Sequence, residues 1–342
     1  MIGERVKLVR EASRLTQQEL AVRANVSQAA LSEIEAGRVM NPLDETIAKI
    51  AEATQFPVSF FYRGPLPDLP DGHYRRLARG TSKVEKQIRA QVRHIVEIVQ
   101  ESEQLLRLPR VTIEPVRLEG GLDAIEAVAN EVRAKLGLGS GDPIPNLTRA
   151  VERAGVIVVR LPGEMPDHDS FSAWPDFSLE GRPVLALTGG HPGDRDRFNE
   201  GHELGHLVLH TLRSNIDHKR AEEEANRFAG ALLIPADSAR EAMHQPVTLR
   251  VLMGVKATYG VSIAMAAQRA LDLQLISRAQ FVSLRKQLSA RRWTKVEPVE
   301  VSPEKPLLIS KIIVSLAGEG STKEKAARLS MPAFSFRALA SA

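Results

Sequence analysis

Apolar and polar positions along the first part of the chain repeat with the spacing of short helices. An apolar stripe marks the first predicted helix and consists of Ile2, Val6 and Val9. Thr16–Glu19 has the form of a capping box that opens a second helix. Ser27 is placed to cap a third helix over residues 28–36, and Gly37 is placed to end it. With two further helical stretches, the pattern predicts five short helices over residues 1–61.

A proline-rich stretch, residues 65–72, follows and leads into a basic helical run that ends near Leu106. Between residues 75 and 93 the run has one acidic residue, Glu85, and the cations Arg75, Arg76, Arg79, Lys83, Lys86, Arg89 and Arg93. Such a run is typical of a solvated helix face. Two alternatives stay open: a second electrostatic contact to DNA, or a dimer helix with a seam formed by Ile88, Val92, Ile95 and Val99.

The middle of the chain predicts helices packed beside a small sheet. Amphipathic helices are predicted over residues 122–137 and 144–154, and the strand candidates are residues 156–161, 171–174 and 184–188. Beyond Leu273, helical segments lead through a proline-punctuated linker, residues 297–306, to a small helical tail. The predicted fold class is α+β, mostly helical. The expected division into N-terminal domain, linker with basic helix, central domain and C-terminal region is 1–61, 62–120, 121–275 and 276–342.

The strongest chemical signal is His-Glu-x-x-His at residues 202–206, on an apolar predicted helix. Residues four apart share one face of a helix, so His202 and His206 can direct two imidazoles at one metal ion. Glu203 lies one residue round the helix, outside the ligand set but near the open coordination position, where it would act as a general base. His210 is excluded as a third ligand, because a straight helix places it about 12 Å from His202.

A second helix must therefore supply the third ligand. The stretch from Ala221 to Pro235 predicts an apolar helix that begins with three glutamates. Glu222 shares its inward stripe with Asn226, so Glu222 is the expected metal ligand and Asn226 the side chain that orients a ligand from behind. Glu224 is the alternative ligand. The acidic start could also serve only to complement the positive end of the helix dipole.

This part of the chain resembles the ImmA/IrrE family of zinc metallopeptidases. The resemblance covers residues 123–273 and rests on Arg197-Phe198, His202-Glu203-Leu204-Gly205-His206, Leu209-His210 and Glu222-x-x-Ala225-Asn226-x-Phe228-Ala229. It implies a zinc cofactor, a site similar to that of thermolysin-type gluzincins, and a helix-turn-helix repressor as the protein cleaved. One departure is Asn199-Glu200-Gly201, where relatives tend to have small, apolar residues.

The N-terminal region closely resembles the Cro/CI-type, or XRE-family, helix-turn-helix. The matching segments are Leu15-Thr16-Gln17-Gln18-Glu19-Leu20-Ala21, Val26-Ser27-Gln28 and Leu31-Ser32-Glu33-Ile34-Glu35-Ala36-Gly37. Two short helices joined by a turn can place the second helix in the DNA major groove. The resemblance implies that the DNA-binding residues are Gln28, Ala29 and Ser32 at base edges, Gln17, Arg38 and Asn41 at the backbone, and Ser27 at the start of the third helix. It also implies a homodimer on operator DNA.

Composition narrows the setting. The 342 residues carry a net charge of +4, which by itself says little about nucleic acid. The absence of cysteine excludes disulfides and thiolate zinc sites, so any zinc must be held by histidine and carboxylate. No apolar run approaches the ~20 residues that span a bilayer, and no signal peptide is apparent. We expect a cytoplasmic protein without a membrane partner, bound to the nucleoid when on DNA. Asp167–Asp169 is interpreted as a loop rather than another metal site.

Two functions follow from these patterns. The first is a DNA-binding transcriptional regulator with a zinc-dependent endopeptidase domain that cleaves a helix-turn-helix repressor. The alternative is a regulator whose peptidase-like domain senses zinc or an effector without cleaving anything. Fusion to a DNA-binding domain favours sensing. Retention of Glu203 between the two histidines favours cleavage, because a sensor does not need a general base.

Overall fold

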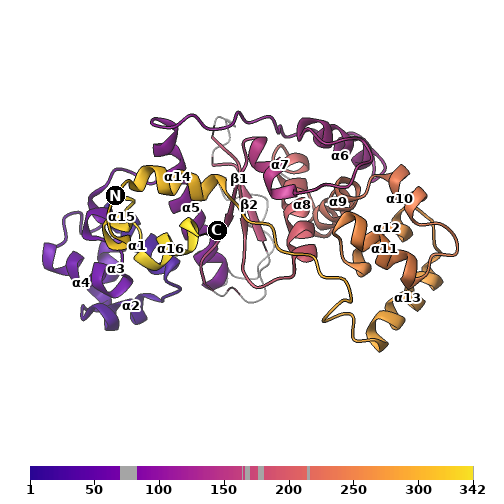
Figure 1. Ribbon diagram of the computed structural model, residues 1–342. Helices are drawn as coiled ribbons and strands as arrows, with labels where there is room; N and C mark the ends of the chain where they lie inside the picture. The colour runs from indigo at the N-terminus through magenta and orange to yellow at the C-terminus, as the bar shows by residue number, and fades with distance from the viewer. Residues whose placement is uncertain (70–82, 164, 166–169, 176–180, 214–215, 342) are drawn as a thin grey trace.

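The computed structural model is elongated, with the N-terminal helices at one end, a small sheet in the middle and the helices of residues 236–290 at the other end (Figure 1). It describes residues 1–69, 83–163, 165, 170–175, 181–213 and 216–341. The predicted loop at Asp167–Asp169 and the cations Arg75, Arg76 and Arg79 lie outside these residues. The described part is mostly helical with one three-stranded sheet, which confirms the α+β, mostly helical prediction.

Five short helices form the N-terminal region, as predicted. They are α1 (Ile2–Ala12), α2 (Gln17–Ala24), α3 (Gln28–Glu35), α4 (Asp44–Thr54) and the 3₁₀ helix η1 (Val58–Tyr62). Thr16 and Glu19 form the capping box of α2, and the Ser27 hydroxyl caps α3 by accepting a hydrogen bond from the Ala30 amide at 3.1 Å. Asn25, between α2 and α3, has a φ of 50°, in the left-handed region that asparagine tolerates. This local chemistry fixes the turn between the two helices.

Helix α5 (Lys83–Glu103) connects the N-terminal helices to the rest of the chain. Its apolar stripe lies in a core shared with the sheet and the C-terminal helices, and consists of Ile88, Val92, Ile95 and Val99. On its basic side, Lys83 lies 3.0 Å from Glu19, and Arg93 lies 2.6 Å from Glu4. The dimer seam proposed for this stripe is therefore wrong. Helical periodicity shows that a stripe is buried, but not which segment covers it.

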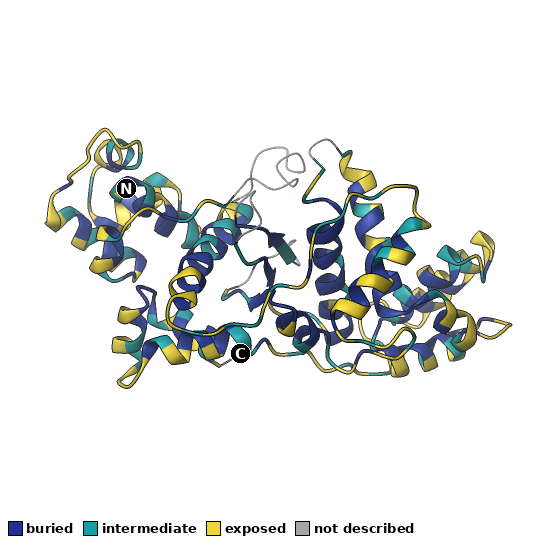
Figure 2. Ribbon diagram, turned by 90° about the horizontal axis from the view of Figure 1, so that it is seen from above, coloured by how far each residue is buried: buried dark blue, intermediate teal, exposed yellow. Residues whose placement is uncertain are grey.

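The sheet has the strand order β1-β3-β2, and its members are β1 (Ile157–Arg160), β2 (Ser170–Ala173) and β3 (Val184–Leu187). These match the three strand candidates. The pair β1 and β3 is parallel, whereas β2 runs antiparallel to β3. Alternate residues face different cores: Val158 and Leu185 pack with the helix that carries the motif, and Val159 and Ala186 pack with α5. Both faces of the sheet are covered, so β3 is buried throughout, and the strands in the middle of Figure 2 are mostly dark blue.

The helices of the central region pack around the motif helix. They are α6 (Ala124–Lys135), α7 (Leu147–Arg153), α8 (Gly193–Leu209) and α9 (His218–Leu233), followed by α10 (Ala236–Ala242), α11 (Leu249–Tyr259), α12 (Ile263–Asp272) and α13 (Arg278–Ala290). Helices α8 and α9 lie very close together at Gly205, where an added Cβ would sit 3.0 Å from the Phe228 ring. No single helix of the described residues has the length and apolar character to cross a membrane, although α11 and α12, bent by 105°, pass that test as a pair.

The chain after α13 runs back across the molecule to the N-terminal half (Figure 1). On the way, the Glu304 carboxylate accepts a hydrogen bond from the Thr148 amide at 2.7 Å, and the Val301 carbonyl accepts one from the Gly193 amide at 3.1 Å. The chain ends in α14 (Leu308–Ala317), α15 (Thr322–Arg328) and α16 (Ala333–Ala340), which share a core with α5 and β1. The predicted linker is thus hydrogen-bonded to α7 and α8. The proposed division of the chain into four regions stays a prediction.

Candidate metal centre and nucleic-acid interface

The motif helix α8 directs its two predicted histidines to one point. Its burial is nearly continuous because the sheet covers one side and α9 the other. His202 and His206, one turn apart, bring their Nε2 atoms to 2.9 Å from each other. That separation requires both rings to turn toward the same space, as the spacing of four residues predicts.

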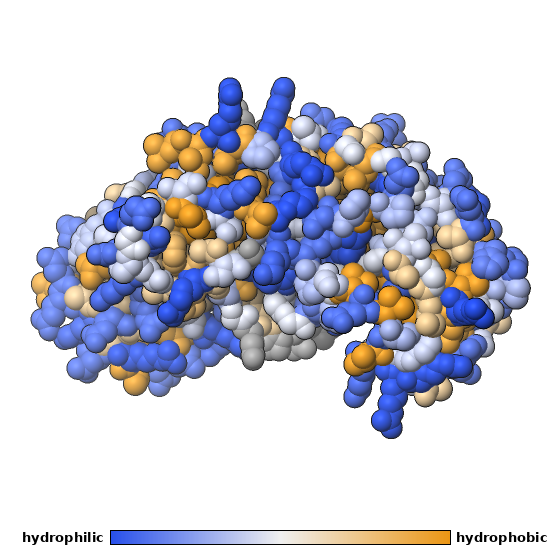
Figure 3. Space-filling view, viewed as in Figure 1, coloured by the Kyte–Doolittle hydropathy of each residue, from blue (hydrophilic) through white to orange (hydrophobic). Residues whose placement is uncertain are grey.

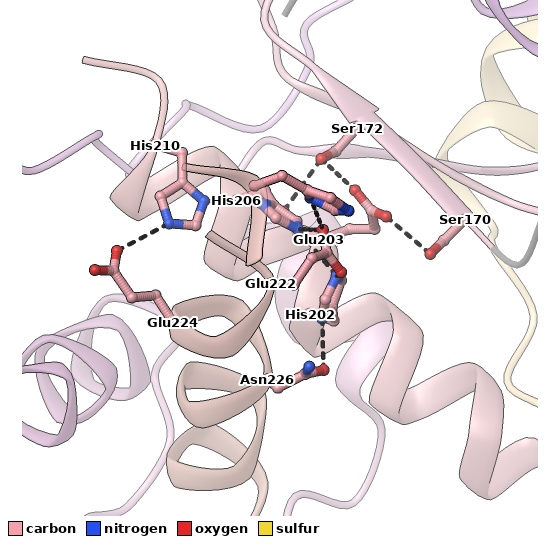
Figure 4. A network of polar contacts seen from close by, with 10 residues as sticks. Ser170, Ser172, His202, Glu203, His206, His210, Glu222, Glu224 and Asn226 are labelled. Atoms are coloured by element: carbon pink, nitrogen blue, oxygen red, sulfur yellow. Dashed lines mark hydrogen bonds and ion pairs between the residues drawn. The ribbon is translucent and has the colours of Figure 1, made fainter. Parts of the chain in front are cut away.

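Glu222, near the start of α9, completes a triad with these histidines (Figure 4). Its two oxygens lie 3.4 Å from the Nε2 atoms of His202 and His206. One ligand atom from each residue can be chosen so that all lie within 4.8 Å of one another. Zinc bonds of 2.0–2.2 Å in a tetrahedron separate neighbouring ligand atoms by about 3.4 Å. The donor set fits a zinc ion held by two imidazoles and a carboxylate: the carboxylate contacts have this spacing, and the two Nε2 atoms, 2.9 Å apart, need to separate by about 0.5 Å.

Electrostatics within the triad favour a negative carboxylate facing the histidines. Desolvation acts to raise the pKa of Glu222, but hydrogen bonds with the two histidines outweigh it and hold this pKa well below its usual range. Burial lowers the pKa of His206 to about 3. For His202, desolvation acts in the same direction, yet the hydrogen bond with Glu222 and the nearby carboxylate charges raise the pKa. The triad thus offers an ionised carboxylate and one neutral imidazole to a cation.

Glu203 points to the sheet side of α8 and is 3% exposed. Its carboxylate accepts hydrogen bonds from the Ser170 hydroxyl at 2.9 Å and the Ser172 hydroxyl at 2.5 Å. Burial raises its pKa, although the charge of His202 and the two serine hydroxyls oppose the shift. The two serines were missed from the sequence. The only available signal was the Ser-x-Ser spacing, which puts both hydroxyls on one face of a strand.

The remaining candidates of this region fall into two groups. Asn226, one turn after Glu222, lies with its Oδ1 atom 3.0 Å from the Nδ1 atom of His202, as expected for a side chain that orients a ligand. Glu224, the alternative ligand, is not brought to the triad, because its carboxylate turns to the far side of α9 and contacts His210. His210 was excluded as a ligand, and the structure accordingly keeps it outside the triad.

Glu200 is a second buried carboxylate that sequence reasoning left without a role. It is 1% exposed and accepts a hydrogen bond from the Thr148 hydroxyl at 2.7 Å. Burial and the neighbouring Glu304 charge raise the pKa of Glu200 to about 8, against the lowering effects of Thr148 and Arg197. A pKa in that range favours the uncharged form of Glu200 at neutral pH, which lowers the cost of burying this side chain.

The second candidate surface is the helix pair α2 and α3 at the N-terminal end. Gln28 and Ala29 at the start of α3 are exposed, Ser32 is partly exposed, and Ser27 caps the helix. The described N-terminal helices show mostly hydrophilic side chains on the face seen at the left of Figure 3. An exposed helix start with short polar side chains has the form needed to approach base edges.

Two of the residues expected at the DNA backbone, Gln17 and Arg38, have partners within the protein. Gln17 donates to Glu35 at 2.9 Å, and Glu35 also pairs with the partly buried Arg10 at 2.7 Å. The Arg38 guanidinium pairs with Glu33 at 2.6 Å, while Asn41 is exposed. Arg38 is thus tied to α3 by an exposed ion pair that phosphate could displace.

Two protein families match the regions that contain the metal triad and the N-terminal helices. Residues 151–271 match a family described as the IrrE N-terminal-like domain, the Peptidase M78 family. Residues 6–61 match a helix-turn-helix family. No curated protein shows a significant match to the chain. The two family matches confirm the fusion that the sequence patterns predicted.

Proposed function

We propose that this chain, a fusion of an XRE-type helix-turn-helix domain with an IrrE/ImmA-like peptidase-family domain, is a transcriptional regulator that hydrolyses peptide bonds with zinc. The observation that carries the proposal is the meeting of His202, His206 and Glu222, with the buried Glu203 on the same helix. A pure structural site has no need of an additional carboxylate beside its ligands.

The residues that would hold the ion are His202 and His206 of α8 and Glu222 of α9. Bound zinc supplies Lewis-acid polarisation of a carbonyl group and of water. The Oδ1 atom of Asn226 would hold the imidazole of His202 in position by accepting a hydrogen bond from its Nδ1–H group. The protein's contribution is to present these three groups on two closely packed helices, so that little rearrangement is needed on binding.

Glu203 is the proposed general base. Its raised pKa brings the carboxylate closer to the pH at which proton transfer is efficient. The hydroxyls of Ser170 and Ser172 hold the carboxylate on the sheet side of α8 and leave its orientation fixed by strand β2. In this role, Glu203 accepts a proton from the attacking water and delivers it to the leaving amine.

The substrate we propose is a helix-turn-helix repressor, as the ImmA/IrrE family resemblance implies. The N-terminal helices would bring the peptidase domain to operator DNA, with a homodimer matching a two-fold site. Recognition of the operator would rest on Gln28, Ala29 and Ser32. The protein would then remove a repressor at the promoter that it occupies.

The experiment that tests this proposal measures zinc per chain and peptide cleavage in wild type, Glu203→Gln and Glu222→Ala. We expect close to one zinc in wild type and in Glu203→Gln, and loss of zinc in Glu222→Ala. Cleavage of a fluorogenic peptide library should fall by about 10²–10⁴-fold in Glu203→Gln, the range for a lost general base. A wild-type protein that takes up no supplied zinc would refute the metallopeptidase proposal.

Sensing without cleavage is the second candidate, and one structural feature favours it. The N-terminal helices are ion-paired to α5, and α5 packs on the same sheet that holds Glu203. Occupancy of the metal site could therefore bias the DNA-binding end. A promoter reporter distinguishes the two: regulation that is unchanged in a Glu203→Gln strain supports sensing, and a promoter locked in one state supports proteolysis.

A further inference from the structure

Behind the triad, a second row of polar side chains runs away from the zinc ligands. His210 ends α8 one turn after His206, and the Nδ1 atoms of the two rings lie 2.7 Å apart. The Nε2 atom of His210 lies 3.2 Å from the Glu224 carboxylate. The side chains of His210 and Glu224 are each only 2% exposed. Figure 4 shows this row, Glu224 to His210 to His206, leading to the triad from the side opposite Glu203.

Donor and acceptor rules fix the protons along this row. The Glu224 carboxylate also receives hydrogen bonds from Arg213 and from Arg220, the latter at 2.8 Å. An ionised carboxylate can only accept, so the Nε2 atom of His210 must be the donor. A neutral imidazole carries one N–H, which leaves the Nδ1 atom of His210 as an acceptor. The Nδ1 atom of His206 must then donate.

Charge balance supports a neutral His210. Glu224 is already paired with two arginines, so an imidazolium at His210 would add a third cation around one buried carboxylate. The two arginines, whose side chains are 23% and 59% exposed, already neutralise the Glu224 charge, so the carboxylate does not need a proton on His210 as well. With its proton on Nδ1, His206 keeps the lone pair of Nε2 for a cation held between it, His202 and Glu222, whereas a proton on Nε2 would be donated to Glu222, 3.4 Å away.

We propose that Glu224 and His210 are positioning residues that fix the tautomer and ring orientation of His206. His202 has the corresponding support from Asn226, so each histidine of the triad has one acceptor behind its Nδ1 atom. The consequence for zinc rests on the proposed function, but the tautomer of His206 does not. Glu224 thus has a task beside the metal site without being a ligand. Outer partners of this kind typically contribute 10–100-fold in metal affinity.

The first measurement reads the tautomers directly in metal-free protein, by long-range proton–nitrogen spectra of ¹⁵N-histidine-labelled chain. We expect His206 as the Nδ1–H form and His210 as the Nε2–H form. Glu224→Gln keeps the shape but supplies an amide that can donate as well as accept, so both rings should become mixtures. Wild-type His206 in the Nε2–H form, or His210 as an imidazolium, would overturn the proposal.

The second measurement is zinc affinity by chelator competition. His210→Leu removes the acceptor and should weaken zinc binding by about 10–100-fold. His210→Asn returns an acceptor near the Nδ1 position and should recover most of that loss, which a merely structural role would not explain. The exposed His244 supplies the matched control, His244→Leu, with unchanged affinity expected. Equal zinc affinity of wild type and the properly folded His210→Leu protein would also overturn the proposal that His210 positions His206.

The two proposals fail in different ways. Suppose that wild type binds no zinc and still shows the Nδ1–H form of His206, altered by Glu224→Gln. That result supports the positioning role of Glu224 and His210 and refutes the metallopeptidase proposal. If zinc binds with full stoichiometry while His206 of the metal-free protein is in the Nε2–H form, the positioning role is refuted and the metal site is supported. If His210→Leu does not fold, the tautomers of His206 and His210 in the near-isosteric Glu224→Gln protein still test the positioning role.

Discussion

Helices α8 and α5 both bury ionisable side chains, but they do so in opposite ways. On α8, His202 and His206 converge with Glu222 on one point, and the triad's facing atoms leave room for a cation. On α5, Glu97 is neutralised by Arg5 at 2.6 Å, and His94 lies between aromatic rings. The first arrangement can gain a ligand, whereas in the second the charge of Glu97 is already neutralised within the protein.

The origin of the partners also differs. The triad joins residues that are 4 to 20 positions apart, on two helices that follow one another along the chain. Glu97 on α5 meets Arg5 from the first helix, 92 residues away. A site made by neighbouring helices can be expected from helical spacing, while a joint between distant segments depends on the path of the whole chain. Three changes test how far this contrast extends.

The largest effect is expected from breaking the charge pair of the α5 joint. Glu97→Leu leaves the guanidinium of Arg5, which is 1% exposed, buried without its carboxylate. Loss of one partner of a buried pair costs about 3–5 kcal/mol of unfolding free energy. Urea unfolding, followed by circular dichroism, measures it. Zinc content per folded chain should stay as in wild type, because the triad lies on other helices.

A double variant provides the control for that pair. Arg5→Met with Glu97→Leu removes both charges and fills the space with apolar groups. Replacement of a whole buried pair is often neutral or stabilising, so most of the lost stability should return. If the double variant is as unstable as the single one, packing rather than charge holds this joint.

The next effect concerns pH and the buried His94. Burial lowers the pKa of His94 to about 4 from 6.5, although Glu97 opposes the shift. As pH falls from 6.5 to 4, the unfolded chain binds a proton that the folded chain does not bind. The unfolding free energy should therefore decrease over this window, by about 3 kcal/mol from this residue, and level off below it.

Comparison with His94→Phe isolates this contribution. Phenylalanine suits the neighbouring rings of Phe56 and Phe60, which lie 5.6 and 5.3 Å from the imidazole. The variant should lose about 3 kcal/mol less than wild type between pH 6.5 and 4 in urea titrations. Identical slopes in the two proteins would assign the acid sensitivity to other groups.

The smallest effect is expected at the α8–α9 contact. In Gly205→Ala, the new methyl group would meet the Phe228 ring at 3.0 Å and force the two helices apart slightly. Overpacking costs about 1–3 kcal/mol, offset by about 1 kcal/mol from the helix propensity of alanine. We expect a net loss of about 0–2 kcal/mol together with weaker zinc binding, since the ligands sit on both helices.

Gly201→Ala is the matched control on the same helix. Its added Cβ would have ordinary contacts of 3.4 and 3.5 Å with Ala229. The same gain in helix propensity should then make it neutral or slightly stabilising, with zinc affinity unchanged. If Gly201→Ala and Gly205→Ala weaken zinc binding equally, the close approach at Phe228 is not what sets the triad geometry.

Several features of the fold and site could be predicted from the sequence because each depends on a short stretch of chain. The capping box at Thr16 and the cap at Ser27 are satisfied by amides three residues away. The strand pattern marked all three strands. The convergence of His202 with His206 follows from the helical repeat, and the structure also brings Glu222 to them. Their roles as zinc ligands stay a prediction that the proposed measurement of zinc would decide.

Other features could not be predicted from the sequence because they depend on contacts between distant segments. Ser170 and Ser172 reach Glu203 only because β2 packs beside α8. The carboxylate of Glu224 turns to His210 and Arg213 rather than to the triad, and its position in the acidic run did not indicate this. Sequence spacing could rank Glu222 above Glu224, but it could not assign the second glutamate a partner.

By itself, the sequence determined the two family resemblances, the fold class, and the helix that carries His202, Glu203 and His206. Helical rise and strand alternation act over a few residues, so these patterns survive without knowledge of the path of the chain. Only the tertiary structure decided what covers α5, where the C-terminal helices pack, and which side chains stand behind the triad. Those contacts depend on which distant surfaces meet, and an amphipathic pattern shows that a face is buried without specifying its partner.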